Sequence, residues 1–195
     1  MAARRSLRLG VYGGTFDPVH HGHLILAHDA LEQARLDAVL FVPCAQSPHK
    51  DARPLTPDAG RVAMLKLALK PEPRFWLSRC ELDRGGPSYA IDTVAEIEAA
   101  FPRAQLFWLI GEDQLPRLHQ WHRWPELKKQ VRFLLLARAT KPSRKKGGPV
   151  LGLPRPRRVD ISATEIRHRL KSRLPIDHLV PARVAAYIER HRLYR

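Results

Sequence analysis

Short apolar runs rich in Val, Leu, Ile and Phe recur along the first 137 residues, and each is bounded by Gly, Pro or charged residues. Runs of this kind are typical of buried strands. They predict strands at residues 7–12, 38–43, 75–78, 106–110 and 133–137. Between the runs, apolar residues recur every three or four positions. This periodicity predicts helices at residues 24–34, 59–69, 90–100 and 125–130.

The alternation of strands and helices predicts an α/β fold. We expect a Rossmann-like doubly wound parallel sheet with helices on both faces, in a single domain that spans residues 1–195. Ligands of such sheets bind beyond the carboxyl ends of the strands. The loops that follow the strands are therefore where functional residues should lie.

The pattern changes after residue 137. Residues 140–156 combine Lys and Arg with glycines and prolines, which predicts a flexible basic surface loop. Residues 158–161 are expected to form a last strand. Residues 157–195 then make up a C-terminal helical part, with helices at residues 163–171 and 182–191 and Ser162 as the N-cap of the first of these helices.

The composition is that of an ordinary globular domain, with 195 residues of which 44% are hydrophobic and 27% charged. No apolar run approaches the roughly 20 residues that cross a bilayer, and residues 1–8 lack the hydrophobic region of a signal peptide. We therefore expect a cytoplasmic protein without a membrane segment. Cys44 and Cys80 are too far apart to indicate a zinc ribbon or a disulfide framework.

The net charge is unusual, because 34 Lys and Arg residues against 19 Asp and Glu residues give +15. Such an excess favours an anionic partner, either nucleic acid or small phosphorylated ligands. The chain lacks a helix-turn-helix signal, zinc-ligand spacing and the aromatic strand motifs of RNA-binding domains. A basic nucleic-acid-binding protein stays as the non-enzyme alternative, but we do not expect nucleic acid to be the partner.

Residues 13–23 join the first predicted strand to the first predicted helix and read G-G-T-F-D-P-V-H-H-G-H. Gly13 and Gly14 allow the backbone to approach a ligand closely, and the helix start offers N–H groups to an anion. His20 and His23 are three residues apart, so both can point toward the same ligand. The run matches neither the P-loop nor the dinucleotide pattern. Zinc binding, for which the H-E-x-x-H spacing is missing, and a structural role are the competing interpretations.

The same run resembles the signature of the HxGH-type nucleotidyltransferases, which are related to the class I aminoacyl-tRNA synthetases. The resemblance implies that ATP is a substrate and that the reaction is adenylyl transfer. It further implies that ATP contacts Gly13, Gly14, Thr15, Phe16, His20 and His23.

A second motif lies at residues 161–167, which read I-S-A-T-E-I-R. Ser162 as N-cap, with Glu165 completing a capping box, would be a sufficient structural explanation. A helix start with an arginine one turn along is also an anion site. The segment resembles the I-S-x-T-x-x-R element of the same family. This resemblance implies that ATP, through its β- and γ-phosphates, contacts Ile161, Ser162, Thr164 and Arg167.

Four further segments resemble one branch of this family, the bacterial nicotinate-nucleotide adenylyltransferases. Residues 47–50 read S-P-H-K, and by this resemblance Lys50 neutralises phosphate charge. Residues 111–113 read G-E-D and resemble a G-x-D element at the ATP site, which comprises Gly111 and Asp113. In that element the aspartate accepts a hydrogen bond from the adenosine ribose.

The other two segments resemble elements of the acceptor pocket. Residues 88–93 read S-Y-A-I-D-T and resemble S-Y-T-x-x-T, although Ala90 stands where the branch usually has threonine. Residues 121–124 read W-H-R-W; Trp121 is our candidate for stacking on the pyridine ring, and Trp124 for the core. Helix capping by Ser88 and packing of Tyr89 are equally good explanations of those two residues. The resemblance implies that nicotinate mononucleotide contacts Thr15, Lys50, Ser88, Tyr89, Ala90, Trp121 and His122.

The implied reaction is attack of the phosphate of nicotinate mononucleotide on the α-phosphorus of ATP, which gives nicotinate adenine dinucleotide and pyrophosphate in NAD biosynthesis. A phosphate dianion is already a nucleophile, so catalysis requires positioning and charge neutralisation. We expect His20, His23, Lys50 and Arg167 to provide both, with Mg²⁺ held mainly by the phosphates of ATP rather than by protein ligands. Nicotinamide mononucleotide and phosphopantetheine are alternative acceptors within the superfamily.

Overall fold

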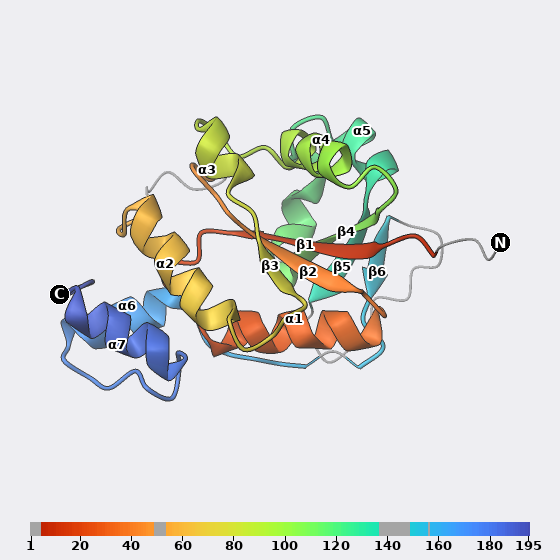
Figure 1. Ribbon diagram of the computed structural model, residues 1–195. Helices are drawn as coiled ribbons and strands as arrows, with labels where there is room; N and C mark the ends of the chain where they lie inside the picture. Colours follow the sequence, from red (N-terminus) through yellow and green to blue (C-terminus); the bar gives the residue numbers. More distant parts are fainter. Residues whose placement is uncertain (1–4, 49–53, 137–148, 156) are drawn as a thin grey trace.

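A computed structural model describes residues 5–48, 54–136, 149–155 and 157–195. Its centre is a six-stranded sheet in the order β3-β2-β1-β4-β5-β6, and every neighbouring pair is parallel. Figure 1 shows the strands running side by side through the middle of the molecule. The strands are β1 (Arg8–Gly14), β2 (Ala38–Pro43), β3 (Phe75–Leu77), β4 (Gln105–Gly111), β5 (Arg132–Leu136) and β6 (Val150–Gly152).

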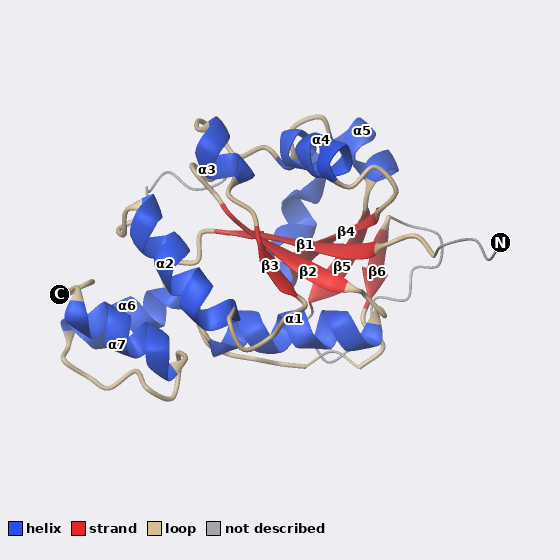
Figure 2. Cartoon of the chain, in the orientation of Figure 1, coloured by secondary structure: helices blue, strands red, loops and turns tan. Residues whose placement is uncertain are grey.

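Helices cover both faces of the sheet (Figure 2). One face carries α1 (His21–Gln33), α2 (Asp58–Leu69), α6 (Ala163–Lys171) and α7 (Ala182–Arg190). The other face carries α3 (Cys80–Arg84), α4 (Ala90–Ala100), the 3-10 helix η1 (Glu112–Gln120) and α5 (Trp124–Gln130). The doubly wound α/β fold expected from the sequence is confirmed.

The two faces explain why the strands are apolar without interruption. In β2, Val39 and Phe41 pack with α1 and α2, whereas Leu40 and Val42 pack with α4. Side chains alternate between the faces of a strand, so a strand covered on both sides needs apolar residues at every position. All six residues of β2 are buried.

The predicted elements agree closely with the structure up to residue 136, where strands and long helices differ from prediction by up to three residues at their ends. The short helix α3, the 3-10 helix η1 and strand β6 were not predicted. Strand β6 lies inside the segment that we expected to be a loop, so that prediction is wrong for residues 150–152. Residues 140–148 lie outside the described residues.

The prediction of a last strand at residues 158–161 is wrong. This segment forms no ladder with the sheet and instead belongs to a connection from β6 to α6 that runs along α1. Gln33 and Arg155 exchange side-chain-to-backbone hydrogen bonds, and the Arg157 guanidinium lies 3.1 Å from the buried Asp29 carboxylate. Polar partners on α1, rather than the edge of the sheet, therefore hold this segment.

The strand order locates the expected ligand crevice. From β1 the chain moves outward through β2 and β3, then returns to place β4 on the opposite side of β1. In open α/β sheets, ligands bind beyond the carboxyl ends of the strands at the point where the order reverses. The loops that follow β1 and β4 carry residues 15–20 and the start of η1, and they meet at this crevice.

Candidate active site

The loop after β1 is tightly packed around Phe16. This residue has a φ of 50°, a left-handed conformation that side chains seldom adopt, and its buried ring packs against Tyr12, Phe41 and His23. A Cβ atom on Gly14 would lie 3.0 Å from this ring, and one on Gly13 would lie 3.1 Å from the Trp108 ring. A side chain at either glycine would therefore require the neighbouring ring to shift by a few tenths of an ångström.

His20 and His23 stack on each other at the start of α1. Their ring centroids are 3.7 Å apart with an interplanar angle of 25°, and His20 is the N-cap residue. The backbone N–H of His20 donates to Nδ1 of His23 over 3.3 Å. In the neutral ring the proton then lies on Nε2, which makes that nitrogen a donor. The two rings therefore lie side by side, and that both point toward one ligand stays a prediction.

A buried arginine behind this loop was not found from the sequence. Arg61 of α2 is 0% exposed and donates to the carbonyl oxygen of Thr15 over 2.8 Å and to that of Cys44 over 2.7 Å. It also pairs with the Asp58 carboxylate. Because a peptide unit is planar and trans, fixing the Thr15 carbonyl turns the Phe16 N–H to the opposite side. The available signal was an arginine on the apolar stripe of a predicted helix.

The second motif meets the first through Arg167. Its guanidinium donates to the carbonyl oxygen of Asp17, 150 residues away, over 2.8 Å and to the hydroxyl of Thr164 over 3.2 Å. Ser162 is the N-cap of α6, as predicted, and its Oγ accepts a hydrogen bond from the Glu165 N–H. The loop after β1 and the start of α6 therefore lie side by side, as the two-motif interpretation requires.

The G-E-D segment at residues 111–113 brings its glycine and its aspartate close together. Gly111 is the last residue of β4, and Asp113 is an exposed residue in the first turn of η1. A Cβ atom on Gly111 would lie 2.4 Å from Oδ1 of Asp113. A side chain at Gly111 would therefore require the exposed Asp113 carboxylate to turn away from the position that it has here.

The residues predicted for the acceptor pocket fall into two groups. Tyr89 and His122 come together, with ring centroids 4.3 Å apart. Ser88 instead ties two loops together: its Oγ accepts from the Ala45 N–H over 3.0 Å, and its N–H donates to the carbonyl oxygen of Gln46 over 2.8 Å. The N-cap of α4 is Tyr89, so the alternative of Ser88 as a helix cap is wrong. Ala90 is the first residue of α4 and is half-buried.

Packing does not distinguish the stacking role predicted for Trp121 from the core role predicted for Trp124. Both Trp121 and Trp124 are partly exposed, and both contact the Phe133 ring, at centroid distances of 6.0 and 5.1 Å. Trp121 also meets Trp108 edge to face. The stacking role of Trp121 stays a prediction. Lys50, predicted to be both catalytic and acceptor-binding, lies outside the described residues.

A buried carboxyl group lies next to the acceptor segment. Glu81 of α3 is 2% exposed and accepts a hydrogen bond from Thr93 over 2.6 Å. Burial raises the pKa of Glu81, and hydrogen bonds from Thr93 and Ser88 oppose part of this rise. Burial also raises the pKa of the nearby Cys80 thiol, which keeps it protonated and unreactive.

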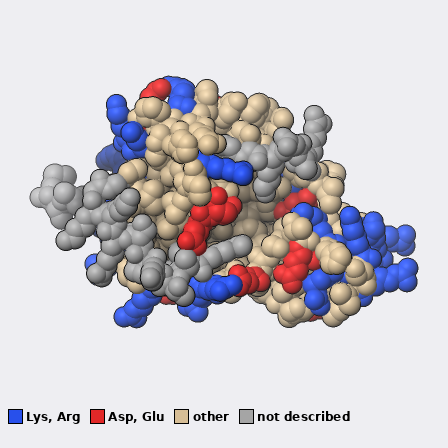
Figure 3. All heavy atoms as spheres, turned by 180° about the vertical axis from the view of Figure 1, so that it is seen from behind, with Lys and Arg blue, Asp and Glu red and all other residues tan. Residues whose placement is uncertain are grey.

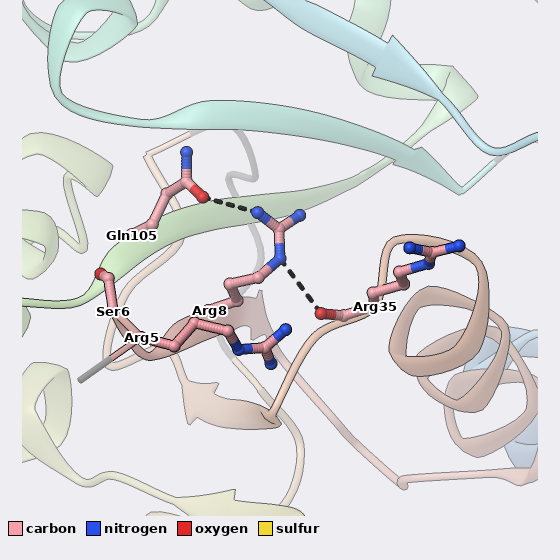
Figure 4. A pocket seen from close by; sticks show the side chains of 5 residues that line it. All are labelled: Arg5, Ser6, Arg8, Arg35 and Gln105. Carbon is pink, nitrogen blue, oxygen red and sulfur yellow. Dashed lines mark hydrogen bonds between the residues drawn. The ribbon is translucent and has the colours of Figure 1, made fainter. Parts of the chain in front are cut away.

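A cavity of about 480 Å³ opens at the opposite, amino edge of the sheet (Figure 4). Arg5, Arg8 and Arg35 line it, but Arg8 donates to Gln105 and to the carbonyl oxygens of Ala34 and Arg35. Arg5 pairs with Asp37, whose pKa is lowered first by the hydrogen bond from the Arg8 N–H. Arg5 and Arg8 therefore have their partners within the fold, and the carbonyl oxygen of Arg35 is one of them.

Lys and Arg side chains also gather over the C-terminal helical part, as Figure 3 shows from behind. The exposed Lys and Arg residues of α6, α7 and the segments that directly follow them are Lys171, Arg173, Arg183, Arg190, Arg192 and Arg195. Such a surface raises the local concentration of anions and is consistent with small phosphorylated ligands. No helix among the described residues is long and apolar enough to cross a membrane.

Together, a parallel sheet in this strand order and a glycine and histidine loop clamped by Arg167 define a nucleotide-binding α/β domain of the nucleotidyltransferase type. The chain belongs to the cytidylyltransferase-like family, whose sequence profile matches residues 11–169. Within that family, its relatives are nicotinate-nucleotide adenylyltransferases, so the resemblance stated from the motifs is confirmed.

Two of these relatives cover nearly the whole chain. A probable nicotinate-nucleotide adenylyltransferase of Methylacidiphilum infernorum is 44% identical over 97% of this chain and 93% of its own length. The nicotinate-nucleotide adenylyltransferase of Bacillus subtilis is 40% identical over 96% of this chain and 98% of its own length.

Among solved structures, the fold is similar to that of Plasmodium falciparum nicotinic acid mononucleotide adenylyltransferase complexed with NaAD. The TM-score is 0.78 at 18% identity, over 96% of this chain and 97% of the other. At this identity the comparison shows the fold alone.

Proposed function

We propose that this chain transfers the adenylyl group of ATP to nicotinate mononucleotide, giving nicotinate adenine dinucleotide and pyrophosphate in NAD biosynthesis. The observation that carries the proposal is the contact between Arg167 and the carbonyl oxygen of Asp17, which joins the two predicted ATP-binding motifs at the carboxyl end of β1. The names of the relatives support adenylyl transfer and nicotinate mononucleotide as the acceptor.

In the proposed reaction, a phosphate oxygen of the mononucleotide forms a bond to the α-phosphorus of ATP. The bond from the α-phosphorus to the bridging oxygen breaks, and pyrophosphate leaves with the electron pair. No residue forms a covalent intermediate, because the attacking phosphate is itself the nucleophile. The protein therefore contributes positioning and charge neutralisation.

We assign the neutralising roles to side chains on both motifs. His20 and His23, with the N–H groups of the loop after β1, would donate to the α-phosphate oxygens. Ser162, Thr164 and Arg167 would hold the β- and γ-phosphates, where charge increases as pyrophosphate leaves. Lys50 would neutralise charge between the two anionic substrates, and Asp113 would accept a hydrogen bond from the ribose.

Magnesium fits this proposal as an ion carried by the nucleotide. Among the residues that the structure describes, no group of three or more His, Cys, Asp or Glu side chains gathers as a metal site. The Asp17 carboxylate, which lies in the loop after β1, accepts from the N–H groups of Leu55 and Thr56 and from the Tyr194 hydroxyl. When bound, Mg²⁺ would neutralise charge on the phosphate oxygens of ATP.

The test is pyrophosphate release from ATP and Mg²⁺ with a panel of acceptors: nicotinate mononucleotide, nicotinamide mononucleotide and phosphopantetheine. The proposal predicts the highest kcat/KM with nicotinate mononucleotide, and loss of turnover when Mg²⁺ is chelated. A higher kcat/KM with either of the other acceptors would contradict it.

A further inference from the structure

Asp17 collects hydrogen bonds from three segments that are far apart in the sequence. Its carboxylate accepts from the N–H of Leu55 over 2.7 Å and from the N–H of Thr56 over 3.3 Å, in the segment that leads to α2. It also accepts from the hydroxyl of Tyr194, 177 residues away. Its carbonyl oxygen accepts from Arg167. One residue of the loop after β1 is therefore held both by the segment before α2 and by the C-terminal part of the chain.

The position of Tyr194 makes this contact specific. The residue lies beyond α7, where Leu193 donates its N–H to the carbonyl oxygen of Ile188 and returns the chain toward the sheet. The side chain of Tyr194 is 9% exposed, and Asp17 is 3% exposed. A buried carboxylate without donors is costly, so removing one of three donors should weaken the hold on Asp17 measurably.

The phenol stays protonated and can therefore donate to the Asp17 carboxylate. Burial and the adjacent Asp17 carboxylate both raise the pKa of Tyr194, which keeps the hydroxyl protonated. A second link ties the same part of the chain to the same loop, since the N–H of His21 donates to the carbonyl oxygen of Leu179 over 2.9 Å. The C-terminal part is thus fastened on either side of His20.

We propose that Tyr194 is a positioning residue for the triphosphate of ATP. Its hydroxyl fixes the Asp17 carboxylate, and the Asp17 main chain in turn fixes Arg167 relative to the histidine pair. The distance between the two halves of the clamp then depends on a side chain that touches neither substrate. This inference rests on the proposed function for the identity of the ligand.

The closest test is Tyr194→Phe, which removes one hydroxyl and retains the ring. Loss of one hydrogen bond to a charged group should raise the KM for ATP, or lower kcat, by about tenfold. The KM for nicotinate mononucleotide should change by less than about twofold, because none of the described acceptor residues forms a hydrogen bond with Asp17. Tyr187→Phe is the matched control, since Tyr187 lies on α7 and its hydroxyl makes no hydrogen bond among the described residues.

Binding of a non-hydrolysable ATP analogue, measured by calorimetry, separates this inference from the proposed function. Weaker analogue binding by Tyr194→Phe than by Tyr187→Phe supports the inference even if nicotinate mononucleotide is not the acceptor. Equal binding and equal kinetics in the two variants overturn it. If Tyr194→Phe fails to fold, Asp17→Asn gives the same test. That variant keeps the volume of the side chain but places an amide NH₂ against a donor, and unchanged ATP affinity would overturn the inference.

Discussion

Arginines lie at both ends of the strands of the sheet, but the groups that they contact differ between the two ends. At the amino edge, Arg8 spends its donors on Gln105 and on two carbonyl oxygens, and its guanidinium lies 4.5 Å from the centre of the Phe107 ring. At the carboxyl edge, Arg61 and Arg167 hold the carbonyl oxygens of Thr15 and Asp17, which belong to the candidate site. The comparison shows that an arginine indicates a functional site through the groups that its guanidinium contacts. Three arginines line the cavity at the amino ends of the strands, but the arginines that hold the candidate site lie at the carboxyl ends.

If the carboxyl edge is the catalytic one, the histidine pair should give the largest effect. His20→Ala and His23→Ala remove donors to the reacting phosphate, so each should lower kcat by about 10²- to 10³-fold. His23 also accepts from the His20 N–H, so a loss of about 1 kcal/mol in the free energy of unfolding should accompany its removal. Steady-state kinetics and urea unfolding measure the two effects. If both variants had a kcat close to wild type, the prediction that the active site lies at the carboxyl ends of the strands would be wrong.

Arg61 should affect both activity and stability. Arg61→Met leaves the carbonyl oxygens of Thr15 and Cys44 without their buried donor, which should lower the free energy of unfolding by about 2–4 kcal/mol. Misplacement of the loop after β1 should also lower kcat/KM by about tenfold or more. Lys66→Met is the control, because Lys66 is an exposed cation on the same helix. A stability loss with unchanged kcat/KM would show that Arg61 supports the fold only.

At the amino edge the expectation is reversed. Arg8→Met removes the hydrogen bonds to Gln105 and to the carbonyl oxygens of Ala34 and Arg35, and should lower the free energy of unfolding by about 1–3 kcal/mol. The kcat/KM for both substrates should stay within about twofold of wild type, because no predicted site residue in the described part of the chain forms a hydrogen bond with Arg8. A loss of activity larger than the loss of stability explains would break the contrast between the two edges.

The smallest effect concerns the anionic group at the carboxyl edge. The pKa of Glu81 is raised in the folded protein above its ordinary value of 4.5. Between the ordinary pKa and the raised pKa of the folded protein, Glu81 binds more protons in the folded state than in the unfolded state. The free energy of unfolding therefore falls as pH rises from the ordinary pKa to the raised one. Glu81→Gln should therefore gain stability relative to wild type above the raised pKa and lose that advantage near pH 4. Unfolding curves at several pH values measure the difference.

The matched variant for this pH comparison is Glu189→Gln, which changes an exposed carboxylate on α7. It should show no such trend with pH. A gain for Glu81→Gln that is equal at every pH would mean that packing, rather than ionisation, controls the stability at this position.

The periodicity of apolar residues was enough to predict the strands and helices that pack against many apolar side chains. Strand β2 could be predicted because both of its faces are covered, and α4 because its apolar residues recur at helical spacing. Strand β6 was not predicted, since its three residues follow a run of Gly, Pro, Lys and Arg that is typical of a loop. Residues 158–161 were wrongly predicted to form a strand. The connection from β6 to α6 is held by side chains of α1 such as Asp29, and sequence spacing does not identify such partners.

The site followed the same division. The glycine and histidine run is local, so its strand-turn-helix context could be predicted from the sequence. Arg61 could not, because a lone arginine in a helix usually faces water, and here only the carbonyl oxygens of two other segments explain its burial. The contact of Tyr194 with Asp17 spans 177 residues, and no spacing rule reaches that far.

The His20 N–H donates a hydrogen bond to the His23 ring, so the exchange of this amide proton with solvent depends on the position of that ring. This amide is shielded by the His23 side chain, which we predict to contact the nucleotide. A ligand that draws the ring away would expose the amide to solvent, and one that fixes the ring would shield it further. The exchange rate of this single proton would then report the position of the imidazole in solution, without a label and without turnover.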